Sequence, residues 1–260
     1  MSDTTQTTPQ QRPVALPERI RYSIVVPCYN EQDSIVPLIE EIIAVIGDDS
    51  AFEIVIVDDG STDQTRSRLA QAKNRLAVPF RAIVHAVNCG QSAAIYSGVD
   101  AAGGEWIITL DGDGQNDPGD IPNLINTLDA TTGATGSPII CGHRTTRRDP
   151  WVRKLSSMVA NVVRSRLLND ATPDTGCGLK LFRRDAFMRL PRFDHMHRFL
   201  PALMLRDGGV MVSVAVGHRP RRTGQSNYGI HNRLWSGIVD LIGVMWLRRR
   251  QFKSTNYEEL

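Results

Sequence analysis

The chain has 260 residues, of which 41% are hydrophobic and 22% are charged. This balance is typical of a soluble globular protein and excludes a disordered, collagen-like or disulfide-stapled chain. Its 30 basic and 28 acidic residues give a formal net charge of +2, which is too balanced to indicate a nucleic-acid partner. The length allows one large domain or two small ones.

The cysteines and the lengths of the hydrophobic runs indicate the cellular compartment of the protein. No C-x-x-C pair occurs among the four cysteines, Cys28, Cys89, Cys141 and Cys177. With no secretory leader at the polar N-terminus, we expect reduced thiols in the cytoplasm. No run reaches the roughly 18 apolar residues that a spanning helix needs, since the nearest, 234–247, is short and contains Asp240.

The first half of the chain has a regular rhythm. Residues 1–20 are rich in Thr, Gln and Pro without a hydrophobic period, which predicts a disordered leader. Short apolar runs then follow at 23–26, 53–57, 80–85, 106–110 and 139–142. Amphipathic segments alternate with them at 33–46, 62–76, 91–102 and 118–130. This alternation predicts βαβ units and a largely parallel sheet.

After the fifth apolar run the pattern changes. Residues 143–170 are rich in arginine and helical in pattern, and 171–180 form a turn region of Gly, Thr and Cys. Residues 210–218 alternate like a strand. We expect one α/β domain over 21–230, followed by an amphipathic, basic helix and tail over 231–260.

Polar clusters directly follow three of the predicted strands. Ligands of open α/β sheets bind at the carboxyl ends of the strands, where these clusters fall. Three acidic clusters on one edge repel one another, so a cation should balance them, and a divalent metal bridging a phosphorylated ligand would do so. The clusters are Pro27–Glu31, Asp58–Asp63 and Asp111–Gln115.

Each acidic cluster also has a structural interpretation. Asp111 and Asp113 can take a hard cation with a neutral oxygen from Gln115, but Asp-Gly is also a common turn signal. Ser61 and Asp63 are good helix caps. Asp58, at the strand end, is harder to explain structurally.

As a set, these clusters resemble the family 2 glycosyltransferases of the GT-A fold, through P-x-Y-N-E, D-D-G-S-T-D-x-T and D-x-D-x-Q at 27–31, 58–65 and 111–115. Motifs in the second half are similar to those of dolichol-phosphate mannose synthases and their bacterial polyprenyl-phosphate relatives. They are G-H-R at 142–144, R-K-L-S-S at 153–157, D-x-G-x-G-x-K at 174–180 and H-x-x-R-x-x-G-x-S at 218–226. The resemblance covers about 22–230. It implies an α/β, Rossmann-like GT-A fold with a mixed, mostly parallel sheet flanked by helices, and a C-terminal amphipathic helix.

The resemblance also implies residue roles. Asp58 would accept hydrogen bonds from the base of a nucleotide-sugar. The ligands of Mg²⁺ or Mn²⁺ at the diphosphate would be Asp111, Asp113 and Gln115, and the catalytic residues would be Asp113 and Arg221. The full substrate-binding set is Pro27, Tyr29, Glu31, Ile56, Asp58, Asp111, Gly112, Asp113, Arg144, Arg153, Ser157 and Arg221. Gln91 stands where the family often has a lysine.

The implied reaction is inverting, metal-dependent transfer of a hexose to a polyprenyl or dolichyl phosphate. Mannose from GDP-mannose is the first preference, and a UDP-sugar is the alternative donor. The residue chemistry agrees, because a leaving diphosphate needs cationic stabilisation. A lipid phosphate is already an anionic nucleophile, so it needs arginines rather than a general base.

Two other functions stay open. A family 2 transferase could instead use a sugar hydroxyl as acceptor in polysaccharide or glycolipid synthesis, or the protein could bind nucleotide-sugars without catalysis. Asp174 could be the base for a hydroxyl acceptor, but its Gly-rich setting also predicts a turn cap or a partner for basic neighbours. We therefore leave Asp174 out of the catalytic set.

The C-terminal helix has two possible roles. Apolar residues that can share one broad face precede an arginine cluster, which is typical of a helix lying at a membrane surface. The same face could pack on the domain or on a second subunit of a homo-oligomer. Either role suits a cytoplasmic protein that is peripheral on the cytoplasmic membrane face. The apolar residues are Trp235, Ile238, Leu241, Ile242, Met245 and Trp246.

Overall fold

The computed structural model describes most of the predicted α/β domain and the C-terminal helix. The predicted leader lies outside the described residues except for residue 20, as does most of the arginine-rich region. The described residues are 20–47, 51–76, 78–131, 136–145, 164–168, 170, 172–220 and 230–250.

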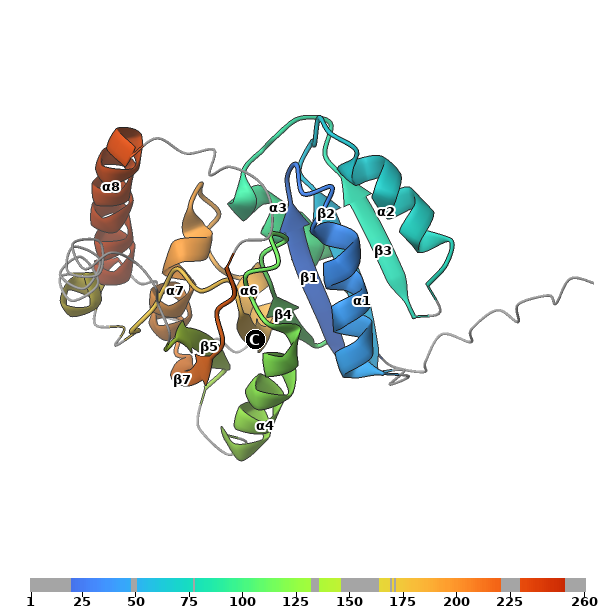
Figure 1. Ribbon diagram of the computed structural model, residues 1–260. Coiled ribbons are helices and arrows are strands. Elements are labelled where there is room, and N and C mark those ends of the chain that lie inside the picture. The colour runs from blue at the N-terminus through green and yellow to red at the C-terminus, as the bar shows by residue number, and fades with distance from the viewer. Residues whose placement is uncertain are drawn as a thin grey trace, which may run out of the picture.

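Seven strands in the described residues form one sheet, in the order β3-β2-β1-β4-β6-β5-β7 (Figure 1). β6 runs antiparallel to β4 and β5, and the other neighbouring pairs are parallel. The predicted mixed, mostly parallel sheet is thus confirmed, although β6 was not predicted. The strands are β1 (Tyr22–Cys28), β2 (Phe52–Asp58), β3 (Phe80–Val84), β4 (Trp106–Thr109), β5 (Pro138–Arg144), β6 (Lys180–Arg183) and β7 (Val210–Val216).

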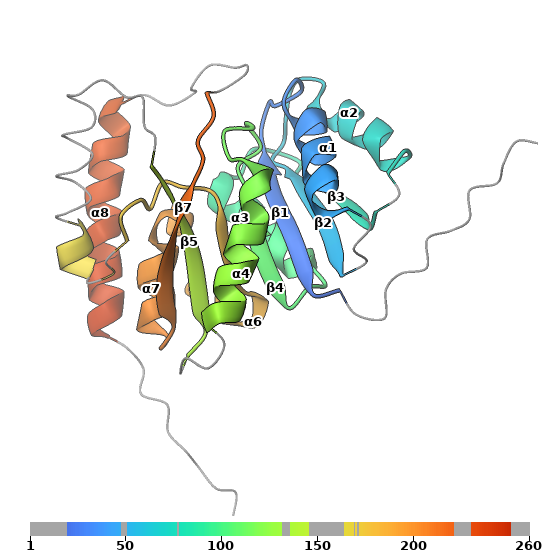
Figure 2. The same cartoon turned by 60° about the horizontal axis from the view of Figure 1, so that its bottom comes forward.

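Helices cover both faces of the sheet (Figure 2). The strand residues alternate between two cores, so Ile24 and Val26 of β1 pack under α1 and α4, and Val25 packs under α3, α6 and α7. All of β1 is buried, which explains why its sequence is apolar rather than alternating. The helices are α1 (Ile35–Ile46), α2 (Thr65–Lys73), α3 (Gln91–Ala101), η1 (Pro118–Asp120), α4 (Ile121–Thr131), α6 (Arg184–Met188), η2 (Met196–Phe199), α7 (Leu200–Arg206) and α8 (Ile230–Arg249).

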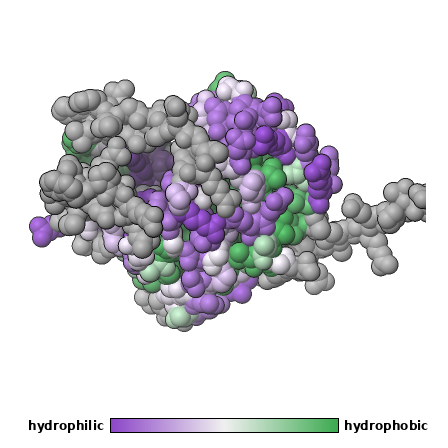
Figure 3. Space-filling view, in the orientation of Figure 1, coloured by the Kyte–Doolittle hydropathy of each residue, from purple (hydrophilic) through white to green (hydrophobic). Residues whose placement is uncertain are grey.

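α8 stands at the end of the sheet that carries α7, opposite α2 (Figure 1). Val244 is buried against the second core, and Leu241 and Met245 pack beside it. None of the described helices has the length and apolar character that crossing a membrane requires. In the orientation of Figure 1, the described surface is largely hydrophilic, with apolar residues gathered beside α1 (Figure 3).

The contact between α3 and the sheet depends on a glycine. A Cβ atom at Gly98 would lie 2.4 Å from Cγ1 of Val25 and 3.0 Å from Cγ2 of Val57. Real Cβ contacts are almost never that short. The helix therefore approaches β1 and β2 this closely only because residue 98 has no side chain.

We predict that Gly98→Ala lowers the free energy of unfolding by about 1–3 kcal/mol, because the added methyl group overpacks the core. The matched control is Gly243→Ala in α8, where a Cβ atom would meet nothing within 4 Å. That variant should be stabilised by about 0.5–1 kcal/mol through helix propensity. Urea denaturation measures both, and an unchanged midpoint for Gly98→Ala would contradict the close approach.

Candidate functional site

The loops after β1, β2 and β4 leave the sheet at the same edge. Cys28 pairs with Asp58 at the ends of β1 and β2. The N–H of Asp59 donates to the carbonyl of Cys28 at 2.9 Å, and the N–H of Gly112 donates to the carbonyl of Pro27 at 3.2 Å. The structure thus brings the three polar clusters together at one edge. We call these segments the acidic rim: 27–31, 58–63 and 111–115.

Hydrogen bonds join the first two segments of the acidic rim. Asn30, whose φ of 54° is left-handed, donates its N–H to Oγ of Ser61 at 2.9 Å. Its side-chain Oδ1 accepts the N–H of Thr62 at 2.8 Å. The N–H of Glu31 donates to Oγ1 of Thr65 at 2.9 Å. These bonds make the two loops one unit and fix the carboxylates that they carry.

Asp58 is fully buried at the end of β2. Its Oδ1 accepts the N–H of Ser61 at 2.9 Å, whereas its Oδ2 has no hydrogen-bond partner among the described residues. Leaving a buried acceptor without a donor costs about 1–3 kcal/mol. An N–H group of a ligand would supply the hydrogen bond that Oδ2 of Asp58 lacks. Asp63, by contrast, lies one residue before the N-cap Gln64 and accepts the N–H of Thr65, the first residue of α2, at 2.9 Å.

Two further carboxylates of the acidic rim, Asp111 and Asp113, lie in the loop after β4. Asp113 accepts the N–H of Gln115 through Oδ1 at 3.0 Å. Burial, and next the charge of Asp113, raise the pKa of Asp111 to about 6. A cation beside Asp111 and Asp113 would reverse this effect, because opposite charge favours the ionised carboxylate. Their oxygen donors suit a hard cation such as Mg²⁺ or Mn²⁺.

Residues that the sequence analysis named without predicting this role form the back of this loop. Nε2 of Gln91 donates to Oδ1 of Asp111 at 2.8 Å. A Cβ atom at Gly178 would lie 2.3 Å from Oδ2 of Asp111, so only glycine fits there. The buried Lys180, whose ammonium donates to the carbonyl of Cys177, acts to lower the pKa of Asp111. The side chain of Asp111 is therefore held in one position by Gln91 and by the close approach of Gly178.

Gln115 is held by the segment that follows β7. Its carbonyl accepts the N–H of Arg219 at 3.0 Å, and its Nε2 lies 3.5 Å from the carbonyl of Arg219. Asn116 and His218 form an isolated bridge beside it. Because the amide nitrogen faces Arg219, Oε1 is the atom that Gln115 could offer to a metal. Arg219 itself pairs with Glu41 and Asp117, which is a structural role.

Arg144 is clamped by a carboxylate. Its Nε donates to Oδ2 of Asp174 at 2.6 Å and its second guanidinium nitrogen donates to Oδ1 at 2.8 Å. These bonds raise the pKa of Arg144. Asp174 thus holds a basic neighbour, one of the two structural roles expected from its sequence. The other predicted phosphate contacts, Arg153, Ser157 and Arg221, lie outside the described residues.

The predicted nucleoside-binding residues differ in how far they are exposed. Ile56 is fully buried in the core with α1, and Pro27 is buried in β1. A Cβ atom at Gly112 would lie 2.8 Å from the carbonyl oxygen of Pro27, so this position requires glycine. Glu31 is buried and accepts a bond from the hydroxyl of Ser34 at 3.1 Å. The side chain of Tyr29 is half-buried.

Comparison with known families identifies the chain's class. A family model described as glycosyl transferase family 2 matches residues 23–190. The chain belongs to glycosyltransferase family 2. This membership, together with the sheet topology, shows that the fold is a GT-A fold, as the sequence resemblance implied, and that the protein is a glycosyltransferase.

This family 2 member has relatives with assigned names. It is 36% identical over 239 residues to a dodecaprenyl-phosphate galacturonate synthase of Rhizobium johnstonii, covering 89% of this chain and 68% of the relative. It is 35% identical over 224 residues to an undecaprenyl-phosphate 4-deoxy-4-formamido-L-arabinose transferase of Pseudomonas savastanoi, covering 86% and 65%. The chain therefore spans about two thirds of the length of these relatives.

Solved structures share the fold of this family 2 glycosyltransferase at low identity. A glucosyl-3-phosphoglycerate synthase of Mycobacterium tuberculosis in complex with Mg²⁺ and uridine diphosphate aligns with a TM-score of 0.64 and 19% identity. The alignment covers 90% of this chain and 81% of that chain. At this identity the similarity supports the GT-A architecture alone.

A histidine links η2 to the start of α3, next to Gln91. Nδ1 of His197 lies 2.7 Å from Oγ of Ser92. Burial, and next the charge of Lys180, lower the pKa of His197 to about 3. The imidazole is therefore neutral at physiological pH and holds α3 by hydrogen bonding rather than by charge.

We predict that His197 makes folding sensitive to acid. Between pH 6.5 and 3, the unfolded chain binds a proton at His197 that the folded protein does not bind, so the free energy of unfolding falls as pH falls. The slope from this group is at most about 1.4 kcal/mol per pH unit. Urea denaturation from pH 6.5 to 4 measures it, and His197→Gln should have the shallower slope. Equal slopes for the two proteins would contradict the assignment.

Proposed function

We propose that this glycosyltransferase moves a sugar from a nucleotide-sugar to a polyprenyl phosphate at the cytoplasmic face of a membrane. One observation supports it most. The acidic rim gathers a buried Asp58 oxygen without a donor and the crowded carboxylates Asp111 and Asp113, which together suit a base N–H and a metal-bound diphosphate. The names of the sequence relatives favour the lipid phosphate acceptor.

The donor would lie across the acidic rim. Asp58 would accept the base N–H through Oδ2, with Tyr29 beside it. Asp111, Asp113 and Oε1 of Gln115 would hold Mg²⁺ or Mn²⁺, as the oxygen donors of this loop allow. The cation supplies charge stabilisation for the leaving diphosphate. Gln91 and the Gly178 backbone keep Asp111 in place for this role.

The acceptor argument favours a phosphate over a hydroxyl. A hydroxyl acceptor needs a general base, and Asp174, the carboxylate that sequence suggested for it, is engaged by Arg144 through two bonds. A lipid phosphate needs cations instead, which Arg144, Arg153 and Arg221 would supply. In-line attack of that phosphate on the anomeric carbon would invert its configuration.

The relatives change the preferred sugar. The sequence resemblance favoured mannose, whereas the named relatives handle galacturonate or 4-deoxy-4-formamido-L-arabinose. We therefore place UDP-galacturonate ahead of GDP-mannose as donor. Incubating the protein with undecaprenyl phosphate and each radiolabelled donor separately tests this order. An acid-labile lipid product marks a phosphate acceptor, and release of label into a polysaccharide or glycolipid alone would favour the hydroxyl-using alternative.

α8 suits attachment to the membrane surface. Val239, Ile242 and Trp246, at helical spacing, are 64%, 62% and 59% exposed. Arg249 and Arg250 follow on exposed positions at the end of the helix. An exposed apolar stripe ending in arginines fits an interfacial helix on anionic lipids. The inward face of α8 packs on the domain, so both roles expected from the sequence are compatible.

We predict that Asp113→Asn lowers kcat for lipid glycosylation by roughly 100-fold or more, because charge on the leaving diphosphate would go unbalanced. The matched control, Asp129→Asn, removes a carboxylate that is 55% exposed and paired with Arg21 on the surface. It should retain full activity. Excess EDTA should abolish transfer by the wild-type protein, and undiminished turnover in EDTA would refute the metal role.

We predict that replacing both Ile242 and Trp246 by Glu weakens binding to anionic phospholipid vesicles by roughly tenfold or more, since each buried apolar side chain contributes about 1.5–3 kcal/mol. The control variant replaces both Ala70 and Gln71 by Glu, at exposed positions of α2 at the opposite end of the sheet. It adds the same two negative charges and should leave binding unchanged (Figure 1). Vesicle co-sedimentation measures all three proteins. Equal binding of the double variant and wild type would assign the stripe another role.

A further inference from the structure

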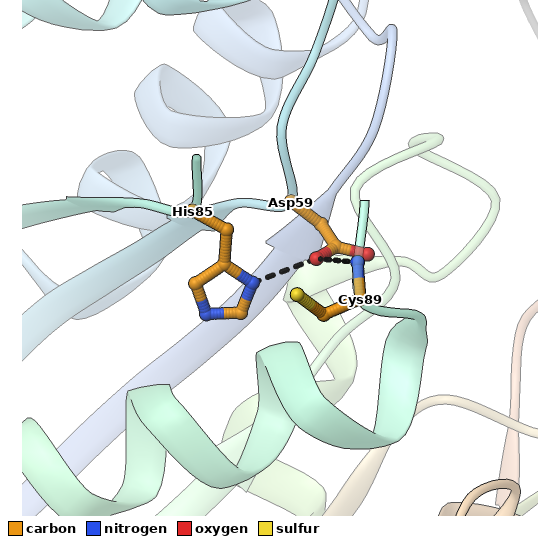
Figure 4. Close-up of side chains that lie close together, drawn as sticks. All are labelled: Asp59, His85 and Cys89. Atoms are coloured by element: carbon orange, nitrogen blue, oxygen red, sulfur yellow. Dashed lines mark hydrogen bonds and ion pairs between the residues drawn. The ribbon is translucent and has the colours of Figure 1, made fainter. Parts of the chain in front are cut away.

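A second group of potential metal ligands shares Asp59 with the acidic rim. Oxygen, nitrogen and sulfur atoms of Asp59, His85 and Cys89 all lie within 4.8 Å of one another (Figure 4). Asp59 follows β2, His85 follows β3, and Cys89 lies in the turn before α3. In the part of the chain that the structure describes, these three side chains are the ones whose ligand atoms lie close enough together to share one ion.

The three ligand types define the metal. Mg²⁺ and Mn²⁺, suited to Asp111 and Asp113, prefer oxygen donors. A thiolate, an imidazole and a carboxylate together suit Zn²⁺, which takes four ligands in a tetrahedron. Three protein ligands would leave the fourth position to water. The ligand chemistry of this cluster therefore differs from that of Asp111 and Asp113.

Two of the three potential ligands, His85 and Asp59, already have the supporting hydrogen bonds that metal sites use. Nε2 of His85 lies 2.9 Å from Oγ of Ser97, which would orient the ring with Nδ1 toward the cluster. Oδ1 of Asp59 accepts the N–H of Cys89 at 2.9 Å, and Oδ2 accepts the N–H of Gly90 at 2.8 Å. Such outer contacts fix the orientation of metal ligands and raise their affinity.

The cluster is held in place by the backbone and is open to solvent. A Cβ atom at Gly60, whose φ is +72°, would lie 2.5 Å from the carbonyl carbon of Val87, so the two loops pack directly against each other. Asp59 is buried, His85 is half-buried and Cys89 is exposed. The ligands thus lie on a rigid support with a route of entry for an ion.

We propose that Asp59, His85 and Cys89 bind one Zn²⁺ ion, separate from the cation proposed at Asp111 and Asp113. On binding, the imidazole proton moves from Nδ1, which lies 2.7 Å from Oδ1 of Asp59, to Nε2. The Nε2–H group then donates a hydrogen bond to Oγ of Ser97. The thiol proton of Cys89 is released to solvent. The ion would fix the turn that precedes Gln91, the residue that contacts Asp111.

The test titrates the chelator-treated full-length protein with Co²⁺, a spectroscopic substitute for Zn²⁺. We expect one Co²⁺ per chain with a thiolate-to-cobalt charge-transfer band, and displacement of that band by Zn²⁺. Cys89→Ser should lose the band, and His85→Gln should weaken binding at least roughly tenfold. Ser97→Ala, which keeps all three ligands, should weaken binding roughly 10- to 100-fold.

Controls separate this site from the proposed cation site at Asp111 and Asp113 and from misfolding. Asp113→Asn should keep the band, because it leaves Asp59, His85 and Cys89 unchanged. Circular dichroism confirms that each variant is folded, and Cys89 is exposed, so its replacement should be tolerated. A wild-type protein without the band, or a band that persists in folded Cys89→Ser, would overturn the proposal. The three side chains would then hold the turn by hydrogen bonds alone.

Discussion

Crowding of carboxylates at the carboxyl ends of β1, β2 and β4 is the constraint on which the rest of the site depends. The parallel sheet forces the loops after these strands to one edge, so their acidic residues meet. The energetic consequence is visible at Asp111, whose pKa rises to about 6 through burial and the neighbouring Asp113. A separate cost arises at Asp58, which has a buried oxygen without a hydrogen-bond donor among the described residues. A bound cation and a ligand N–H would relieve both costs.

The fold supports this edge with contacts that are remote in sequence. The loop that carries Asn30 is bonded to Ser61 and Thr62, and α3 approaches the sheet closely at Gly98. That approach brings Gln91, at the start of α3, within 2.8 Å of Asp111. The order of elements along the sheet, rather than any one motif, thus determines where the carboxylates lie.

Much of the sheet could be predicted from the sequence, because strands buried on both faces must be apolar. The five apolar runs correspond to β1 through β5, and the alternating run corresponds to β7. β6 escaped prediction because its four residues begin with Lys180 and end with Arg183. Its strand conformation comes from pairing with β4 and β5, which no local pattern encodes.

The candidate site was predictable where its residues follow strands and hidden where contacts join distant elements. Asp58, Asp111 and Asp113 were found from their positions after apolar runs. Gln91 and Asp59 were noticed in the sequence, but their contacts were not predicted. Gln91 contacts a residue 20 positions away, and Asp59 holds a turn some 30 positions away. The packing of α8 could not be predicted from sequence either. Its apolar residues are divided between a face packed on the domain and a face exposed to solvent.

The most direct test of this account measures whether cation and nucleotide bind as a unit. Isothermal titration of the full-length protein with UDP and with GDP, each with Mn²⁺ and with EDTA, gives the coupling. The account predicts that Mn²⁺ tightens binding of the preferred nucleotide by roughly 5- to 150-fold, and that a variant with Asp111 and Asp113 replaced by Asn loses this gain. Equal affinity with Mn²⁺ and with EDTA would contradict it.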